Sequence, residues 1–145
     1  MRVTYESQFI VSDVHDHAIL NIMIDHTTIH VDDIVVSKNF YLHALEPLGY
    51  KIVMDFPEMK AAGLGVQGKM DTWLHGHGCN QPIHIAWQAD TREQVDAFYV
   101  AALAAGGKDN GKPGIRAMYH PHYYAAFVID QNGHNIEVVC HTASE

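Results

Sequence analysis

Two short segments of alternating apolar and polar residues each begin with a histidine. They span residues 26–31 and 84–89. In an extended strand, residues two positions apart share a face. His26 and His84 therefore lie on the smaller, more polar face of each strand, while bulky apolar side chains occupy the opposite face. The pattern predicts two strands that bury one face and line a cavity with the other.

A helical pattern follows each strand. Ser37 is the predicted N-cap of the first helix, and Thr91 with Gln94 predicts a capping box for the second. Residues 47–49 and 106–107 contain the Pro and Gly signals expected at helix ends. The apolar positions that recur at helical spacing are Phe40, Tyr41, Ala44, Leu45 and Leu48, and then Val95, Phe98, Ala102 and Leu103.

An internal repeat relates these two regions. With a shift of 58 positions, residues 26–49 and 84–107 share seven identities, whereas chance gives about one or two. The identical pairs are His26 with His84, Asp32 with Asp90, Phe40 with Phe98, Tyr41 with Tyr99, Ala44 with Ala102, Leu45 with Leu103 and Gly49 with Gly107. The repeat indicates two halves of one pseudo-symmetric domain.

Three further strand-like runs follow each helix. They are residues 50–56, 61–67 and 71–75, and then residues 115–119, 123–130 and 135–141. The order βαβββ, used twice, predicts an α+β fold. We expect a half-open, eight-stranded mixed barrel with its helices outside and a ligand site in its hollow.

The chain length suits one compact domain, because it has 145 residues. We expect a single domain over residues 23–145, with modules of about 24–79 and 82–141. Residues 1–22 differ in pattern and are interpreted as an N-terminal extension.

Composition and charge narrow the expected partners. The net charge is −8 with neutral histidines, which argues against nucleic acid or an anionic membrane surface as the main partner. No apolar run reaches the roughly 20 residues that cross a bilayer, and the N-terminus lacks the apolar core of a signal peptide. A cytoplasmic location is therefore expected. Cys79 and Cys140 are expected to be reduced thiols, with a single disulfide as the alternative.

Glu137 is the most informative acidic residue. It follows an Asn-Gly turn and stands among Ile136, Val138 and Val139, where an ionised carboxylate is costly unless a cation compensates it. We hypothesise that His26, His84 and Glu137 bind one divalent metal (Zn, Ni, Mn or Fe(II)).

The alternative for these three residues involves no metal. In it, the two histidines are hydrogen-bonded core residues, and Glu137 pairs with Arg116 or Lys112.

The segment before the seventh predicted strand is rich in polar side chains. Tyr119, His120 and Tyr123 are candidates for proton donors or substrate hydrogen-bonding groups at the cavity mouth. Arg116 is a candidate for binding a substrate carboxylate. The alternative is that these residues form only a loop rim. Residues 111–114 lack the spacing of a phosphate-binding loop and are predicted to be a turn.

Four sequence motifs together carry a resemblance to a known family. They are Asp25-His26, the stretch from Ser37 through Phe40-Tyr41 to Leu48-Gly49-Tyr50, the run from Pro82 to Trp87, and the turn and strand from Asp130 to Glu137. With the doubled βαβββ order, they resemble the vicinal oxygen chelate superfamily. That group includes glyoxalase I, the bleomycin-resistance proteins and the extradiol dioxygenases.

The resemblance implies a metal-dependent enzyme that acts on a small oxygen-bearing substrate, as a lyase, an isomerase or a ring-cleaving dioxygenase. It also implies a homodimer. Glyoxalase I-like members have a fourth metal ligand on the last strand of the first half. Here the corresponding position holds Thr72, Trp73 or Leu74. The alternative implied function is a metal-free protein that binds a small molecule or drug, as in the bleomycin-resistance branch.

Overall fold

The computed structural model describes residues 24–143. The N-terminal extension predicted at residues 1–22 lies outside the described part of the chain. The first module contains β1 (Thr27–His30), α1 (Ile34–Ala44), the 3₁₀ turn η1 (Glu46–Leu48), β2 (Lys51–Phe56), the 3₁₀ turn η2 (Pro57–Met59), β3 (Ala61–Val66) and β4 (Lys69–His75). The second contains β5 (His84–Gln88), α2 (Arg92–Ala104), β6 (Lys108–Ile115), β7 (Tyr124–Ile129) and β8 (Asn135–Cys140).

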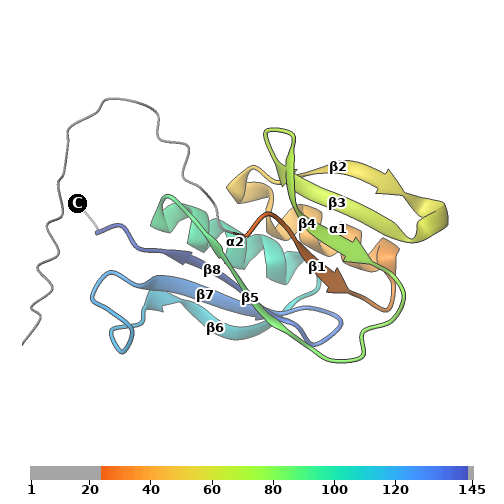
Figure 1. The fold of residues 1–145 in the computed structure, drawn as a ribbon. Coiled ribbons are helices and arrows are strands. Elements are labelled where there is room, and N and C mark those ends of the chain that lie inside the picture. The colour runs from red at the N-terminus through yellow and green to blue at the C-terminus, as the bar shows by residue number, and fades with distance from the viewer. Residues whose placement is uncertain (1–23, 144–145) are drawn as a thin grey trace, which may run out of the picture.

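Each module forms one four-stranded mixed sheet. The strand orders are β1-β4-β3-β2 and β5-β8-β7-β6, and the first strand of each module pairs in parallel with the last. The two sheets lie side by side, with α1 and α2 behind them (Figure 1). This confirms the α+β fold of two βαβββ modules. The sheets do not close into a barrel.

One hydrophobic core joins the two modules. Phe40 of α1 and its repeat partner Phe98 of α2 are both fully buried and belong to the same cluster. Ile29 and Val31 are also fully buried, as the strand alternation predicts. Because the helices and the inner sheet faces share this core, the opposite faces of both sheets remain available for ligands.

The first helix begins earlier than predicted. Its N-cap is Asp33, whose side chain accepts hydrogen bonds from the backbone N–H groups of Val35 and Val36. The prediction of Ser37 was wrong, because an aspartate four residues earlier already satisfies the free N–H groups. The Thr91–Gln94 capping box is confirmed. Gly106 follows α2 with a left-handed φ of 97°.

The sixth strand was also predicted in the wrong place. It spans Lys108–Ile115, so residues 111–114 are part of a strand and not a turn. The pairing of β6 with β7 shifts register between Asp109 and Gly111 and again between Gly111 and Gly114. Such bulges break the two-residue alternation from which strands are predicted.

Buried polar groups connect the two modules. The Tyr41 hydroxyl on α1 donates to the Asp130 carboxylate at 3.0 Å. His134 accepts a hydrogen bond from the Ile83 N–H through Nδ1 and donates through Nε2 to the backbone oxygen of His30 at 2.9 Å. These bonds fix how one module is oriented on the other. Within residues 24–143, none of the helices has the length and apolar character needed to span a bilayer.

Candidate metal and substrate site

Glu137 and His84 meet on the face of the second sheet that is turned away from the hydrophobic core. Glu137 pairs in register with Ala86 on the neighbouring strand β5. His84, two residues before Ala86, therefore lies on the same face. Its Nε2 is 3.1 Å from Oε2 of Glu137. The Glu137 side chain is buried, whereas that of His84 is half exposed.

The protonation of His84 makes this contact informative. Its Nδ1 lies 3.0 Å from the backbone oxygen of Asn135, and because a carbonyl only accepts, Nδ1 carries a proton. A neutral imidazole then has a lone pair on Nε2, facing a carboxylate oxygen that also carries lone pairs. Two such atoms stay 3.1 Å apart only when a proton or another cation links them.

The donor set fits a divalent metal. Two neighbouring ligand atoms at about 2.1 Å from one octahedral metal lie about 3.0 Å apart, close to the spacing of the His84 and Glu137 atoms. The hydrogen bond from Nδ1 of His84 to Asn135 is the kind of outer contact that orients a metal-bound imidazole. His84 and Glu137 are therefore suited to act as two adjacent ligands.

Tyr123 holds the other oxygen of Glu137. Its hydroxyl donates to Oε1 at 2.6 Å, which leaves Oε2 to face His84. Burial is the main cause that raises the pKa of Tyr123 to about 12, with further contributions from the hydrogen bond to Glu137 and the charge of that carboxylate. Tyr123 is therefore a protonated donor at neutral pH that orients the carboxylate.

The other three candidate residues come from the same loop between β6 and β7. The Tyr119 ring packs on Tyr123 with centroids 4.8 Å apart. The His120 ring lies 5.5 Å from that of Tyr123, and its Nε2 is 2.8 Å from Nδ1 of His141. The guanidinium of Arg116 lies 5.4 Å above the ring of Phe127. Of the four candidates, Tyr123 contacts Glu137 directly, Tyr119 and His120 pack on Tyr123, and Arg116 packs on Phe127.

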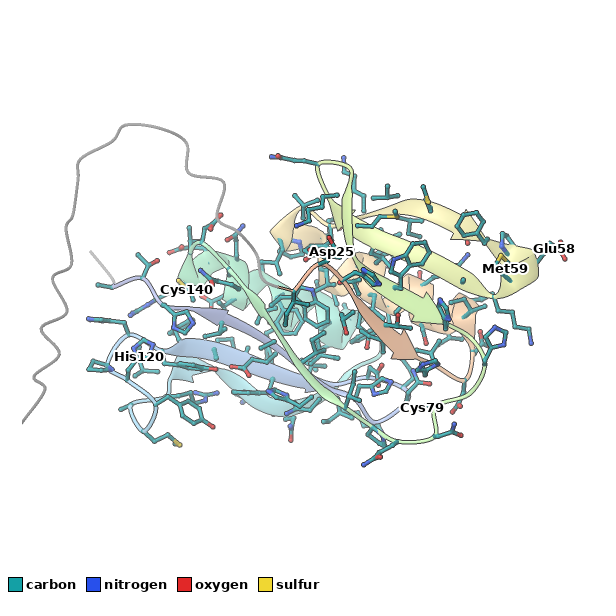
Figure 2. All side chains as sticks on the ribbon, in the orientation of Figure 1. Asp25, Glu58, Met59, Cys79, His120 and Cys140 are labelled. Atoms are coloured by element: carbon teal, nitrogen blue, oxygen red, sulfur yellow. The ribbon has the colours of Figure 1, made fainter. Side chains whose placement is uncertain are left out.

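His26 is placed at the junction of the two sheets. Figure 2 labels its neighbour Asp25 there, and His120 on the loop at the far end of the second sheet. His26 and His84 line the same cavity of about 410 Å³. Nδ1 of His26 lies 2.8 Å from the Asp25 carboxylate, so its Nε2 also has a free lone pair in the neutral form.

The three predicted ligands do not converge on a single metal position in the described part of the chain. Within residues 24–143, no group of three or more His, Cys, Asp or Glu side chains is arranged to hold a metal. The structure brings His84 and Glu137 together and leaves His26 on the other side of the shared cavity. The three-ligand site therefore stays a prediction.

Strand register identifies the fourth-ligand position. Thr28 pairs with Trp73 in the first module as Ala86 pairs with Glu137 in the second. Trp73 is thus the counterpart of Glu137. Its indole stacks on Phe56, with the ring planes only 11° apart. An aromatic surface stands where glyoxalase I-like proteins were expected to have a metal-binding side chain.

Two residues of this site were not singled out from the sequence. Phe127 is the register partner of Glu137 on β7, and its ring stacks on His84 at 6.4 Å. Asn135 supplies the carbonyl that accepts from His84. The sequence does contain a signal for each of them. Asn135 lies two positions before Glu137 and so shares its face of the strand, and a hairpin with its turn at residues 130–134 pairs Phe127 with Glu137.

Comparisons with known proteins agree with this architecture. A structure described as a glyoxalase/bleomycin resistance protein from Albidiferax ferrireducens T118 is 26% identical, with a TM-score of 0.69, covering 81% of this chain and 98% of that one. A lactoylglutathione lyase from Agrobacterium tumefaciens is 19% identical, with a TM-score of 0.59, covering 81% and 92%; at that identity it shows only the fold. A search of the curated proteins finds no match.

A family model matches most of the described chain. It covers residues 23–138 and is described as the Glyoxalase/Bleomycin resistance protein/Dioxygenase superfamily. The match includes the first module, the second module as far as residue 138, and each residue of the predicted metal site. This chain therefore belongs to the glyoxalase/bleomycin resistance/dioxygenase superfamily.

Proposed function

We propose that this protein is a metal-dependent enzyme that acts on a small substrate with oxygen donor atoms. His84, Glu137 and His26 are its proposed ligands for a divalent Zn, Ni, Mn or Fe ion. The observation that carries the proposal is the facing pair of His84 Nε2 and Glu137 Oε2, 3.1 Å apart, with Nδ1 of His84 already bonded to Asn135. The bound ion supplies Lewis-acid activation of substrate oxygens or, if it is iron, of dioxygen.

The surrounding residues have separate roles in this proposal. Tyr123 holds the Glu137 carboxylate in one orientation. His120 is the candidate for moving a proton, because its ring contacts Tyr123 and its Nε2 shares a hydrogen bond with His141. Tyr119 packs against Tyr123 but is largely exposed, so its hydroxyl is suited to hydrogen-bond a substrate at the cavity edge.

Metal titration tests the proposal. Chelator-treated protein is titrated calorimetrically with Zn, Mn, Ni and Fe(II), and we expect about one ion per chain for at least one of them. Substitution His84→Ala or Glu137→Ala should weaken binding at least roughly 100-fold, because even a residue that only supports a ligand contributes 10–100-fold. His43→Ala is the matched control, since His43 lies on α1 and bonds to the backbone of Asn39.

Two results would overturn this reading. One is a chain that binds none of the four ions, and the other is an affinity that is unchanged in both His84→Ala and Glu137→Ala. For a loaded protein, dioxygen uptake in the presence of a catechol separates a dioxygenase from a lyase.

A metal-free binding protein is the second candidate. The observation that favours it is Trp73 in the place equivalent to Glu137, stacked on a partly exposed Phe56. Aromatic surfaces of this kind suit a planar drug or metabolite. Ligand-induced protection against heat that a chelator does not change would support this candidate.

We further propose that the protein is a homodimer. Val53, Met54 and Phe56 on β2 are each more than one-third exposed, which is typical of a surface that a second chain covers. Sedimentation velocity measures the mass directly, and a species at the 16.2 kDa of one chain at all concentrations would contradict the proposal.

A further inference from the structure

A second cavity lies beside the pair formed by His84 and Glu137. It has a volume of about 320 Å³ and is lined by Arg116, Phe127 and Asn135, among others. Two of these residues touch the pair directly. The Phe127 ring stacks on His84, and the Asn135 carbonyl accepts its Nδ1 proton. The cavity therefore adjoins the proposed metal site through these two residues.

Arg116 is held in place before any ligand arrives. Its guanidinium carbon lies 5.4 Å above the Phe127 ring, within the range of a cation–π contact. Its Nη2 donates to the backbone oxygen of Lys112 at 2.7 Å. The backbone N–H of Arg116 donates to the backbone oxygen of Tyr123 at 2.7 Å. An arginine that is already ordered loses little conformational entropy when it binds.

Two glycines leave the space that this guanidinium occupies. A Cβ at Gly111 would lie 3.3 Å from Nη2 of Arg116, and one at Gly114 would lie 3.1 Å from Nη1. Both distances are shorter than an ordinary van der Waals contact. Gly111 pairs with Phe127 on the neighbouring strand β7. The bulged strand β6 therefore provides a niche for Arg116 that larger residues would fill.

No carboxylate forms an ion pair with Arg116 in the described part of the chain. The three ion pairs found within residues 24–143 involve other side chains. Of the five N–H donors on the Arg116 guanidinium, one donates to the backbone oxygen of Lys112, and no other hydrogen bond in that range engages the rest. The chain as a whole carries a charge of −8. A preordered guanidinium without a carboxylate partner in an acidic protein is suited to an external anion.

The charge balance favours a carboxylate over a phosphate. One guanidinium compensates the single charge of a carboxylate, and its fork of N–H groups matches the two oxygens. A phosphate monoester carries nearly two charges at neutral pH and would leave one uncompensated. The neighbouring apolar side chains, Phe127 and Met118, suit a short hydrocarbon portion.

We propose that this cavity is a subsite for the carboxylate of a small organic acid. Arg116 binds the carboxylate, and Phe127 and Met118 contact the hydrocarbon portion. The Phe127 ring contacts both Arg116 and His84, so the subsite adjoins the proposed metal site through this ring. Carboxylate binding by Arg116 does not need a metal.

Binding of two matched probes to the chelator-treated full chain tests the subsite. Salicylate carries a carboxylate beside a hydroxyl, and salicylamide has the same ring and hydroxyl without the charge. We expect calorimetry to show saturable binding of salicylate at millimolar concentrations and binding of salicylamide at least about 10-fold weaker. Arg116→Gln should weaken salicylate at least about 10-fold and leave salicylamide unchanged.

Arg92→Gln is the control for the loss of one arginine. Arg92 also lies over an aromatic ring, that of Tyr124 at 5.0 Å, but it belongs to α2 on the opposite side of the sheet. Its substitution should leave salicylate binding unchanged. The proposal is overturned if salicylate does not bind, if salicylamide binds equally well, or if Arg116→Gln binds salicylate as the wild type does. Because no metal is present, these outcomes are independent of the metal titration.

Discussion

Tyr123 orients Glu137 through a short hydrogen bond that depends on its own proton. Its pKa is raised from 10.0 to about 12. A raised pKa means that the folded state favours the protonated phenol, so the stability it contributes is fully present below pH 10 and is lost as the pH rises toward 12. At neutral pH Tyr123 is therefore protonated and its hydrogen bond to Glu137 is intact.

Substitution Tyr123→Phe should change how stability depends on pH at the alkaline end. Between pH 10 and pH 12, we expect the free energy of unfolding to fall less steeply in the variant than in the wild type, because the titrating phenol is gone. Urea unfolding followed by circular dichroism at several pH values measures this slope. Tyr119→Phe is the control, since Tyr119 stacks on Tyr123 without a carboxylate partner in the described residues. Equal slopes in wild type and Tyr123→Phe would contradict the assignment.

At the scale of single elements, helix α1 depends on its N-cap residue, Asp33. Asp33 accepts from two N–H groups, at 2.8 Å and 3.1 Å. Removing that acceptor by Asp33→Ala should lower the free energy of unfolding by about 1 kcal/mol, whereas Asp33→Asn keeps an acceptor oxygen and should change it little. Denaturant titration measures both variants. A loss of the same size in Asp33→Asn would show that charge, and not the cap, stabilises the helix.

The elements also show which parts of the structure are predictable from sequence. Strands with regular alternation, such as residues 26–31, were predicted because burial of every second residue leaves a visible pattern. The start of β6 was missed because its bulges remove that pattern. Asp33 was missed because its neighbour Asp32 and the later Ser37 have similar capping propensities, and only the three-dimensional contacts distinguish them.

The candidate site, too, was predictable from sequence only in part. Glu137 stands out because a carboxylate within an apolar run is unusual, and the repeat relates His84 to His26. The contact between Tyr123 and Glu137 depends on how the loop between β6 and β7 closes, which no local pattern encodes. The distance between His26 and the second module depends on the relative orientation of two sheets, a property of the whole molecule.

For the whole molecule, the hydrogen bond between Tyr41 and Asp130 joins the modules inside the protein. Burial is the main cause that raises the pKa of Tyr41, followed by the charge of Asp130. Tyr41→Phe leaves the buried carboxylate with one donor fewer, and we expect the free energy of unfolding to fall by about 1–3 kcal/mol. Tyr124→Phe, which removes an exposed hydrogen bond to Asp96 within one module, should cost clearly less. Equal losses would show that the junction has no special role.

The single core shared by both modules has an evolutionary consequence. A unit of about 60 residues with one sheet and one helix would leave the inner side of that helix uncovered, so an ancestral half-length chain would have been stable only as a pair. The connection through residues 76–83 makes that pairing intramolecular, so the shared core forms without a second chain. At the equivalent register position the second half has Glu137 and the first half has Trp73.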